Sequence, residues 1–320
     1  MGLSPVVIAV DGGGTKTDVV ALRPDGELVG RVRGGGSNPQ VIGLATSVAL
    51  LDDLVAEASG GAPVQAAGLY LSGLDLPREL DAMSAAIQGH SWAANAVIDN
   101  DLFALLRTGT AEPDAVAVIC GTGINAVGVR ADGAKIRFPA LGHISGDWGG
   151  GSGLGGEVLW HVARAGDGRG PQTALTDAVK AQFGLATVDE LIAQLHFGER
   201  DYEELNALAP AVFALADTDQ VAAGLVDRQA SEIVAMATSC LRRLNLLNHS
   251  VPVVLGGGIL AAGYRRLMDA VRAGLAASAP KARPVVVPSL PVIGAALLTL
   301  SRVQATQAAL DTAQQALSQL

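Results

Sequence analysis

The residues best suited to chemistry stand near the start of the chain, where an apolar run ends in an aspartate followed by three glycines. Because glycine has no Cβ, the backbone N–H groups of such a turn can approach phosphate oxygens closely. Asp11 is a candidate Mg²⁺ ligand, since this cation prefers carboxylate and water oxygens. The stretch predicts a phosphate cradle. Its predicted phosphate contacts are Gly12, Gly13, Gly14, Thr15 and Lys16.

The stretch does not follow the P-loop pattern. The Lys-Ser/Thr pair that should follow a second glycine is missing, and an apolar strand, Val19–Leu22, follows in place of a helix. A lone triple glycine is more often an ordinary hairpin turn. The preceding aspartate and a repeat later in the chain favour phosphate binding.

The repeat lies in the middle of the chain. Gly121-Thr122 follows Gly14-Thr15 by 107 residues, and Asp132-Gly133 follows Asp25-Gly26 by the same interval. Each copy predicts a strand, a glycine loop, a strand, a turn and a third strand. The second copy has no acid at the position of Asp11. This asymmetry suits one nucleotide held by two glycine loops, Gly121, Thr122 and Gly123 forming the second, with a metal ligand in the first only.

The elements that position the first loop are predicted from hydrophobic periodicity. A three-stranded meander precedes an amphipathic helix that begins with Pro39 and turns Val41, Leu44 and Val48 inward. Two further strand-helix pairs follow, so the predicted order is βββαβαβα. The predicted strands are Val6–Val10, Val19–Leu22, Leu28–Val32, Ala66–Leu71 and Ala96–Ile98.

Two acids stand where the last of these strands meets a helix, Leu102–Thr108. An aspartate at the start of a helix is commonly a cap, which is one interpretation of Asp101. A carboxylate beside a bound hydroxyl can also accept its proton, and Asp99 and Asp101 are then rivals for that role. Asn38 likewise has two interpretations, as a cap of the helix that begins at Pro39 and as a ligand contact.

The second half contains a glycine-dense loop, residues 142–156, with eight glycines in fifteen residues. A mostly helical insertion is predicted over about 157–248. A buried strand, Val251–Leu255, then ends in Gly256, Gly257 and Gly258 before a helix over Ala261–Ala277. Strand, glycines and helix in this order are typical of a ligand-binding edge.

Composition limits the function classes. The chain has 320 residues, of which 49% are hydrophobic, and a net charge of −9, which argues against nucleic-acid or anionic-membrane partners. Cys120 and Cys240 have no disulfide or zinc spacing, and Cys120 closes an apolar strand. Two long uncharged stretches are interrupted by glycines and prolines, which disfavours membrane spans. No leader is recognised, so we expect a cytoplasmic protein that binds small molecules.

These motifs resemble the actin-like ATPase superfamily of sugar kinases, Hsp70 and actin. More narrowly, the chain resembles the BadF/BadG/BcrA/BcrD ATPase family and, within it, the eukaryotic-type N-acetylglucosamine kinases. The residues that carry this resemblance are Ser37-Asn38-Pro39, Asn100-Asp101, Gly121–Asn125, Gly142-His143, Gly146-Asp147 and Gly256–Gly258. The resemblance implies two ribonuclease H-like α/β domains with a duplicated core and a cleft between them.

The resemblance also implies an ATP- and Mg²⁺-dependent transfer to the 6-hydroxyl of an amino sugar. Asp11 would hold the metal, Asp101 would act as the base, and the late glycines would face adenosine. Implied sugar contacts are Asn38, Ser72, Gly73, Asn125, His143 and Asp147. The expected domains are 1–113 and 114–320, with the last helix able to pack back on the first, and a homodimer is expected.

One segment departs from the family pattern. Trp148 and three glycines follow Asp147, where relatives usually show an acid and then aromatic residues, so the substrate pocket is expected to differ. Alternative functions are a glucosamine or other amino-sugar kinase, an ATP-driven activator of a dehydratase with a shared iron–sulfur cluster, and a non-catalytic nucleotide or sugar sensor. The two isolated cysteines argue against the activator.

Overall fold

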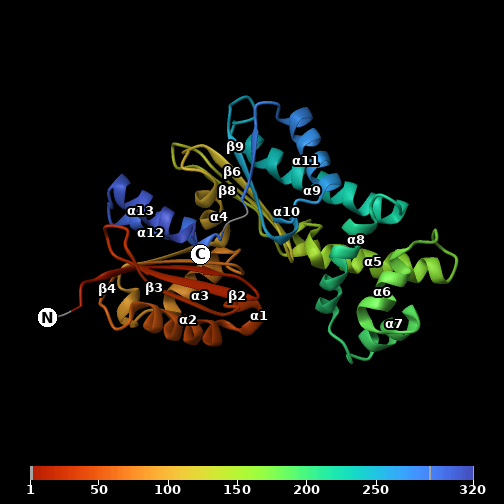
Figure 1. The fold of residues 1–320 in the computed structure, drawn as a ribbon, viewed down its shortest axis with the longest axis horizontal. Coiled ribbons are helices and arrows are strands. Elements are labelled where there is room, and N and C mark those ends of the chain that lie inside the picture. The colour runs from red at the N-terminus through yellow and green to blue at the C-terminus, as the bar shows by residue number, and fades with distance from the viewer. Residues whose placement is uncertain (1–2, 288–289, 320) are drawn as a thin grey trace. The chain divides into compact units, whose positions relative to one another are not determined.

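The computed structural model describes residues 3–287 and 290–319, and these fall into two compact units (Figure 1). One unit comprises Met1–Ala117 together with Val287–Leu320, and the other comprises Val118–Val286. The first boundary lies within a strand of the second sheet. The C-terminal segment therefore belongs to the same unit as the N-terminal sheet.

The first unit is built on a five-stranded sheet of order β3-β2-β1-β4-β5. β1 is parallel to β4, and β4 is parallel to β5, whereas β2 is antiparallel to both β1 and β3. The strands are β1 (Val6–Gly12), β2 (Lys16–Leu22), β3 (Leu28–Gly35), β4 (Val64–Leu71) and β5 (Ala96–Asn100). The predicted meander and two further strands are present.

Helices cover both faces of this sheet (Figure 1). Alternation along β1 turns Ile8 and Val10 towards the core beneath α2, and Val7 and Ala9 towards the core beneath α12. The helices of the unit are α1 (Pro39–Ile42), α2 (Leu44–Ser59), α3 (Pro77–Ala86), η1 (Ser91–Ala93), α4 (Asp101–Gly109), α12 (Val292–Arg302) and α13 (Gln307–Leu317).

The single helix predicted from Pro39 onwards is wrong in one respect, because Gly43 divides it into α1 and α2. Gly43 has φ of +80°, which lies outside the helical region and which glycine adopts without steric cost. The break also turns Val41 outward, leaving it 60% exposed. α1 is therefore a separate short helix, and only α2 packs on the sheet.

The second unit repeats the plan of the first. Its sheet has the order β10-β9-β6-β7-β8, which matches β5-β4-β1-β2-β3 position for position. The strands are β6 (Ala115–Cys120), β7 (Ile124–Val129), β8 (Lys135–Arg137), β9 (Pro252–Gly256) and β10 (Arg283–Val286). The predicted α/β fold with a duplicated βββαβαβα core is confirmed.

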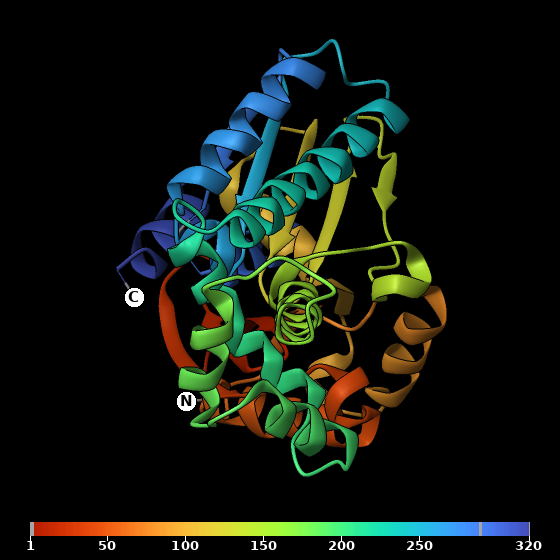
Figure 2. The same ribbon diagram turned by 90° about the vertical axis from the view of Figure 1, so that its right-hand side faces the viewer.

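The regular elements that the structure describes between β8 and β9 are all helices. Figure 2 shows α9 and α11 side by side across one face of the second sheet. The helices of the unit are η2 (Gly142–Ser145), α5 (Gly150–Gly166), α6 (Leu175–Phe183), α7 (Val188–His196), η3 (Tyr202–Leu208), α8 (Ala209–Leu215), α9 (Gln220–Arg243), α10 (Gly258–Ala261) and α11 (Arg265–Ser278). The helix predicted over Ala261–Ala277 is divided, with Gly263 at φ of +68° between α10 and α11.

The glycine-dense segment predicted as a loop becomes helical at Gly150. Glycine lowers helix stability by about 1 kcal/mol relative to alanine, so close packing must compensate. A Cβ on Gly155 would overlap the backbone of Leu205 in η3, and one on Gly156 would meet the Tyr202 hydroxyl. These glycines let α5 lie against η3. Within residues 3–287 and 290–319, no helix is long and apolar enough to cross a membrane.

Candidate active site

The predicted phosphate loop is a tight hairpin between β1 and β2. The Gly13 N–H donates to the Lys16 carbonyl at 2.9 Å, and the Ser37 N–H donates to the Gly13 carbonyl at 3.0 Å. A Cβ on Gly36 would overlap the Gly14 carbonyl, so the segment after β3 supports the hairpin by close backbone contact. Gly14 and the two residues after it are exposed. The part of the loop that is open to a phosphate group is therefore residues 14–16, whereas the Gly13 N–H is used within the hairpin.

Asp11 lies at the end of β1 beside this loop. Burial raises the pKa of Asp11 to about 8, with the charges of Asp101 and Asp18 adding to the shift and those of Lys16 and Arg33 opposing it. Asp11 is therefore mostly protonated at neutral pH without a cation. A divalent cation would favour the carboxylate form, so the residue fits a metal ligand electrostatically.

Polar residues form a row across the end of the first sheet. Asp11 is in register with Asp18 on β2 and with Tyr70 on β4, and Tyr70 is in register with Asp99 on β5. Register partners share a face, so all four side chains lie on the face covered by α12. Burial raises the pKa of the Tyr70 phenol, and the Asp99 charge adds to this shift.

Sequence reasoning missed the partner of Asp18. This carboxylate is fully buried and accepts from Arg33 Nε at 2.8 Å and from Arg33 Nη2 at 2.9 Å. The signal was available, because an acid inside an apolar strand requires a partner and the neighbouring strand carries two arginines. Thr17, also fully buried, donates its hydroxyl to the Gly35 carbonyl at 2.8 Å, so Thr15 is the exposed hydroxyl of this loop.

The junction between β5 and α4 shows which residue caps the helix. Asn100 is the N-cap of α4, and its Oδ1 accepts from the Leu102 N–H at 3.2 Å. Asp101 is the first residue of the helix, and Asp99 Oδ1 accepts from the Asn100 N–H at 2.9 Å. The cap interpretation of Asp101 is thus wrong.

The predicted sugar contacts of the first unit lie together. Asn38 caps α1, its Oδ1 accepting from the Gln40 N–H at 2.8 Å, and a Cβ on Gly73 would overlap this same amide. The Ser72 N–H donates to the Gly12 carbonyl at 2.8 Å. Asn38, Ser72 and Gly73 therefore adjoin the phosphate hairpin. Within the described residues, the buried hydroxyls of Ser37 and Ser72 have no hydrogen-bond partner, which leaves polar groups available at this place.

Glycines from three elements of the second unit meet around the second predicted loop. The Gly151 and Ser152 N–H groups, in the first turn of α5, donate to the Gly121 and Thr122 carbonyls at 2.8 and 2.9 Å. From the other side, Gly257 at φ of +90° lies so close that a Cβ would contact the Cys120 backbone. The structure thus brings the predicted phosphate and adenosine loops together.

The start of α5 was not among the predicted site residues. Gln229 of α9, fully buried, accepts from the Gly150 N–H at 2.8 Å. Its Nε2 has no partner among the residues that the structure describes. A lone glutamine between the buried Leu225 and Ile233 of an amphipathic helix was the signal that could have identified it.

The other predicted sugar contacts differ in exposure. Asn125 and Asp147 are 7% and 8% exposed, whereas His143 lies on the surface of η2. Asn125 Oδ1 accepts from the Ala126 N–H at 2.7 Å. Asp147 accepts a short hydrogen bond from the Ser145 hydroxyl. Both side chains therefore have one local partner that fixes their orientation.

Trp148 departs from the family pattern, and contacts with Glu157 and Arg228 hold its side chain in place. Its indole donates to Glu157 Oε1 at 3.0 Å, and the Arg228 guanidinium lies 3.9 Å from the ring centroid. Arg228 Nη1 also contacts Glu157 Oε1 at 3.1 Å. An acid nine residues later thus holds the tryptophan, and these contacts fix the chain between Asp147 and α5.

The donor set fits Mg²⁺ only in company with phosphate. No group of three or more His, Cys, Asp or Glu side chains within 3–287 and 290–319 could hold a metal ion. Mg²⁺ usually takes one or two carboxylates and fills its remaining positions with phosphate oxygens and water. Asp11 beside a glycine hairpin has this composition.

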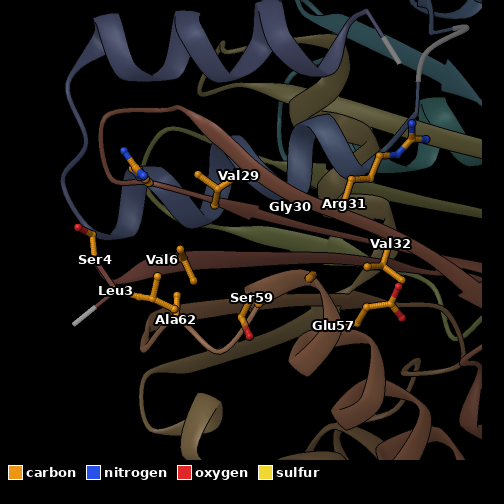
Figure 3. Close-up of a pocket in the computed structure, with 13 residues that line it drawn as sticks. Leu3, Ser4, Val6, Val29, Gly30, Arg31, Val32, Glu57, Ser59 and Ala62 are labelled. Carbon is orange, nitrogen blue, oxygen red and sulfur yellow. The ribbon is translucent and has the colours of Figure 1, made fainter. Parts of the chain in front are cut away.

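A surface cavity lies elsewhere. A cavity of about 320 Å³ lies between β3, the end of α2 and the residues before β1. Figure 3 shows Leu3, Val29 and Ala62 among the residues that line it. It adjoins Val6, at the opposite end of β1 from the phosphate hairpin. None of the predicted site residues lines it, so it is not the candidate active site.

Comparison with known proteins identifies the fold and then the family. A solved structure described as a candidate N-acetylglucosamine kinase from Chromobacterium violaceum superposes with a TM-score of 0.74 at 24% identity, over 92% of this chain and 99% of that one. This likeness shows that the two chains share one fold. The sequence profile of the BadF/BadG/BcrA/BcrD ATPase family matches residues 8–299, and the chain belongs to this family.

Two relatives match along nearly the whole chain. The N-acetyl-D-glucosamine kinase of Dictyostelium discoideum is 27% identical over an alignment of 320 residues, gaps included, that covers 92% of this chain and 98% of the relative. The N-acetylmuramic acid/N-acetylglucosamine kinase of Clostridium acetobutylicum is 24% identical over 301 residues, with the same coverage.

Proposed function

We propose that this protein is an ATP-dependent amino-sugar kinase whose acceptor is the 6-hydroxyl of N-acetylglucosamine. Family membership and two relatives named as kinases of N-acetylated sugars support this proposal. Glucosamine is the alternative acceptor. The proposal includes a homodimer acting in the cytoplasm.

One observation carries the proposal. Among the neighbouring charges, that of Asp101 raises the pKa of Asp11 most, so the base candidate and the metal-ligand candidate lie close enough to interact beside the glycine hairpin. Phosphoryl transfer needs this combination, because the acceptor hydroxyl must lose its proton close to the phosphate and its metal.

In the proposed reaction, the backbone of residues 12–14, with Thr15 and Lys16, binds phosphate oxygens. Mg²⁺ held by Asp11 would offset the negative charge of the triphosphate. Asn38, Ser72 and Gly73 orient the sugar. Asp101 accepts the proton of the 6-hydroxyl at its carboxylate oxygen, which makes the hydroxyl oxygen a better nucleophile.

The second unit has its own proposed roles. Gly121, Thr122 and Gly123 bind phosphate through a backbone held by α5, and Gly256, Gly257 and Gly258 face the adenosine. Asn125, His143 and Asp147 are proposed sugar contacts. These assignments assume that positioning and electrostatic stabilisation supply most of the rate acceleration, as in other phosphoryl transfers.

The activator alternative fits the structure poorly. An iron–sulfur cluster needs accessible thiolates, but Cys120 and Cys240 are buried and burial raises the pKa of each to about 12. Both remain protonated and shielded at physiological pH.

The test is ADP release by the purified protein with MgATP and a panel of sugars. We expect strong stimulation by N-acetylglucosamine, weaker stimulation by glucosamine, and a phosphomonoester at O6 in the ³¹P-coupled spectrum of the product. ADP release that no amino sugar stimulates would refute the kinase. Light scattering of the purified protein tests the dimer separately.

A further inference from the structure

A chain of polar side chains joins three helices of the first unit. Gln40 of α1 donates through Nε2 to Glu79 Oε1 at 2.8 Å and to Asp75 Oδ2 at 3.4 Å. The other oxygen of Glu79 accepts from the N–H groups of Asp75 and Leu76, both at 2.8 Å. Glu79 thereby fixes the turn before α3 and also binds the side chain of Gln40 in α1.

The same turn reaches the start of α4. Asn100 Nδ2 donates to Asp75 Oδ1 at 3.0 Å, and Asn100 is only 1% exposed. Because Asn100 Oδ1 caps the Leu102 N–H, the side-chain amide of Asn100 is held at both ends. Asp75 therefore fixes the N-cap residue that immediately precedes Asp101.

At its other end this row of hydrogen-bonded residues reaches Asn38. The Gln40 N–H donates to Asn38 Oδ1 at 2.8 Å. Gln40 therefore contacts Asn38 through its backbone and Glu79 through its side chain. The start of α1 needs such support, because Gly43 breaks the helix after four residues and α1 contributes no buried residue of its own.

We propose that Asp75 and Glu79 form a bridge that fixes the start of α4 relative to the start of α1, and that Asp75 is a positioning residue for phosphoryl transfer. The inference rests on the proposed function, in which these two helix starts carry the base Asp101 and the sugar contact Asn38. A shift of about 1 Å between such groups costs roughly a hundredfold in rate.

The bridge is poorly explained as a device for stability alone. Asp75 and Glu79 are half-buried and Gln40 is exposed, and hydrogen-bonded charges near the surface contribute little to folding. Only the Asn100 end of the bridge is buried, so the loss of Asp75 would also lower stability by taking this acceptor from the Asn100 amide. The bridge also places two carboxylates on one amide group, which introduces repulsion. We therefore expect its removal to affect turnover more than folding.

The test compares Asp75→Ala with Asp75→Asn. Asp75→Ala removes the acceptor of Asn100, and we expect kcat to fall roughly tenfold to a hundredfold with the KM for ATP changed less than about twofold. Asp75→Asn retains a carbonyl oxygen for Asn100 Nδ2, and we expect it to recover most of kcat. Asp81→Ala, which removes an exposed carboxylate from α3, the helix that follows Asp75, is the matched control and should behave as wild type.

Hydrogen exchange gives a readout independent of turnover. Asp75→Ala should accelerate exchange at the first turn of α4 and in residues 38–43, whereas Asp81→Ala should not. Normal kcat in Asp75→Ala, or unchanged exchange at both helix starts, overturns the bridge while the kinase stands. If wild type phosphorylates no amino sugar, the proposed function fails and the positioning role fails with it.

Discussion

Asp18 and Arg33 form a two-point ion pair on adjacent strands, and the carboxylate end of the pair is fully buried. Asp18 is also in register with Asp11, so this buried carboxylate lies beside the candidate metal ligand. Arg33 offsets the charge of Asp18. A buried carboxylate left without its partner is strongly destabilising.

Arg33→Ala should therefore lower the melting temperature by several degrees. Arg31→Ala is the matched control, since Arg31 Nη2 lies 3.7 Å from Asp18 Oδ1 and makes only the longer contact. We expect a clearly smaller change for Arg31→Ala in thermal unfolding followed by circular dichroism. Equal losses for the two variants would mean that the geometry of the pair is unimportant.

Asp11→Asn should lose most ATP turnover at saturating Mg²⁺, because a neutral amide cannot balance the charge of the metal. The substitution is isosteric and neutral, and it removes the cost of keeping a carboxyl at a place where burial and the neighbouring acids raise its pKa, so the melting temperature should not fall. Steady-state assays over a Mg²⁺ series check the first part. Full turnover in Asp11→Asn would remove this residue from the site.

Asp101→Asn should lower kcat by roughly a hundredfold or more, the usual scale for a lost general base, with little effect on sugar binding. Asp99→Asn should retain most activity, because Asp99 instead accepts from the Asn100 backbone. The measurements are steady-state assays with N-acetylglucosamine and glucosamine, together with calorimetric sugar binding. If Asp99→Asn is the inactive variant, the base has been assigned two residues too late.

Local patterns predicted the parts of this protein that depend on local chemistry. Alternating apolar residues, the Asp11 glycine turn and the repeat with Gly121-Thr122 predicted the strands of the first copy and a second meander, and the family resemblance implied the duplicated α/β core. The order of strands and helices could be predicted because apolar residues recur with the strand or helix period along each element. The helix divided at Gly43 shows the limit, since one glycine in a favourable periodic run did not reveal its positive φ.

The contacts that the sequence did not reveal join residues far apart in the chain. Gln229 meets Gly150, and Asp75 meets Asn100, through packing of whole elements against one another. Hydrophobic periodicity shows which face of an element is buried but not which polar group lies opposite it. The N-cap at Asn100 was missed for a different reason, because neighbouring Asn and Asp residues are nearly equal as caps.

A second polar cluster predicts how stability depends on acid. Trp92 Nε1 donates to Asp52 Oδ1 at 2.7 Å, and His90 Nδ1 lies 2.8 Å from the same oxygen. These hydrogen bonds, that of Trp92 above all, hold the pKa of Asp52 below its usual range against desolvation. A lowered native pKa stabilises the fold above the unfolded pKa of about 3.9, and this contribution is lost as the pH falls below it.

The double-mutant cycle of Asp52→Asn and Trp92→Phe isolates this contribution from the cavity that Trp92→Phe also creates. We expect a coupling free energy of about 1 kcal/mol at pH 7, the usual net value for such a hydrogen bond when the carboxylate is half exposed. At pH 3 the coupling should shrink, because the carboxyl of the unfolded chain, with a pKa of about 3.9, is then mostly protonated. Denaturant unfolding at the two pH values provides the measurement, and an unchanged coupling would contradict the assignment.

Gln229 gives the sharpest test of the second glycine loop. Its Oε1 accepts from the Gly150 N–H, and the next two N–H groups of α5 hold the Gly121 and Thr122 carbonyls. Gln229→Leu would leave the first N–H of α5 buried and unpaired, so the helix start should shift and release the loop. We expect the KM for ATP to rise about tenfold, which corresponds to about 1.4 kcal/mol of lost binding, with the KM for sugar nearly unchanged.

Thr238→Val is the matched control for this variant. Thr238 is 5% exposed on the same helix, and its hydroxyl donates to the Val234 carbonyl within α9. This substitution also removes a buried hydrogen bond, but one that does not reach α5, so its KM for ATP should stay at the wild-type value. If Gln229→Leu lowers the melting temperature and leaves the KM for ATP unchanged, Gln229 only stabilises the packing of α9 on α5, and the loop at Gly121 does not depend on it.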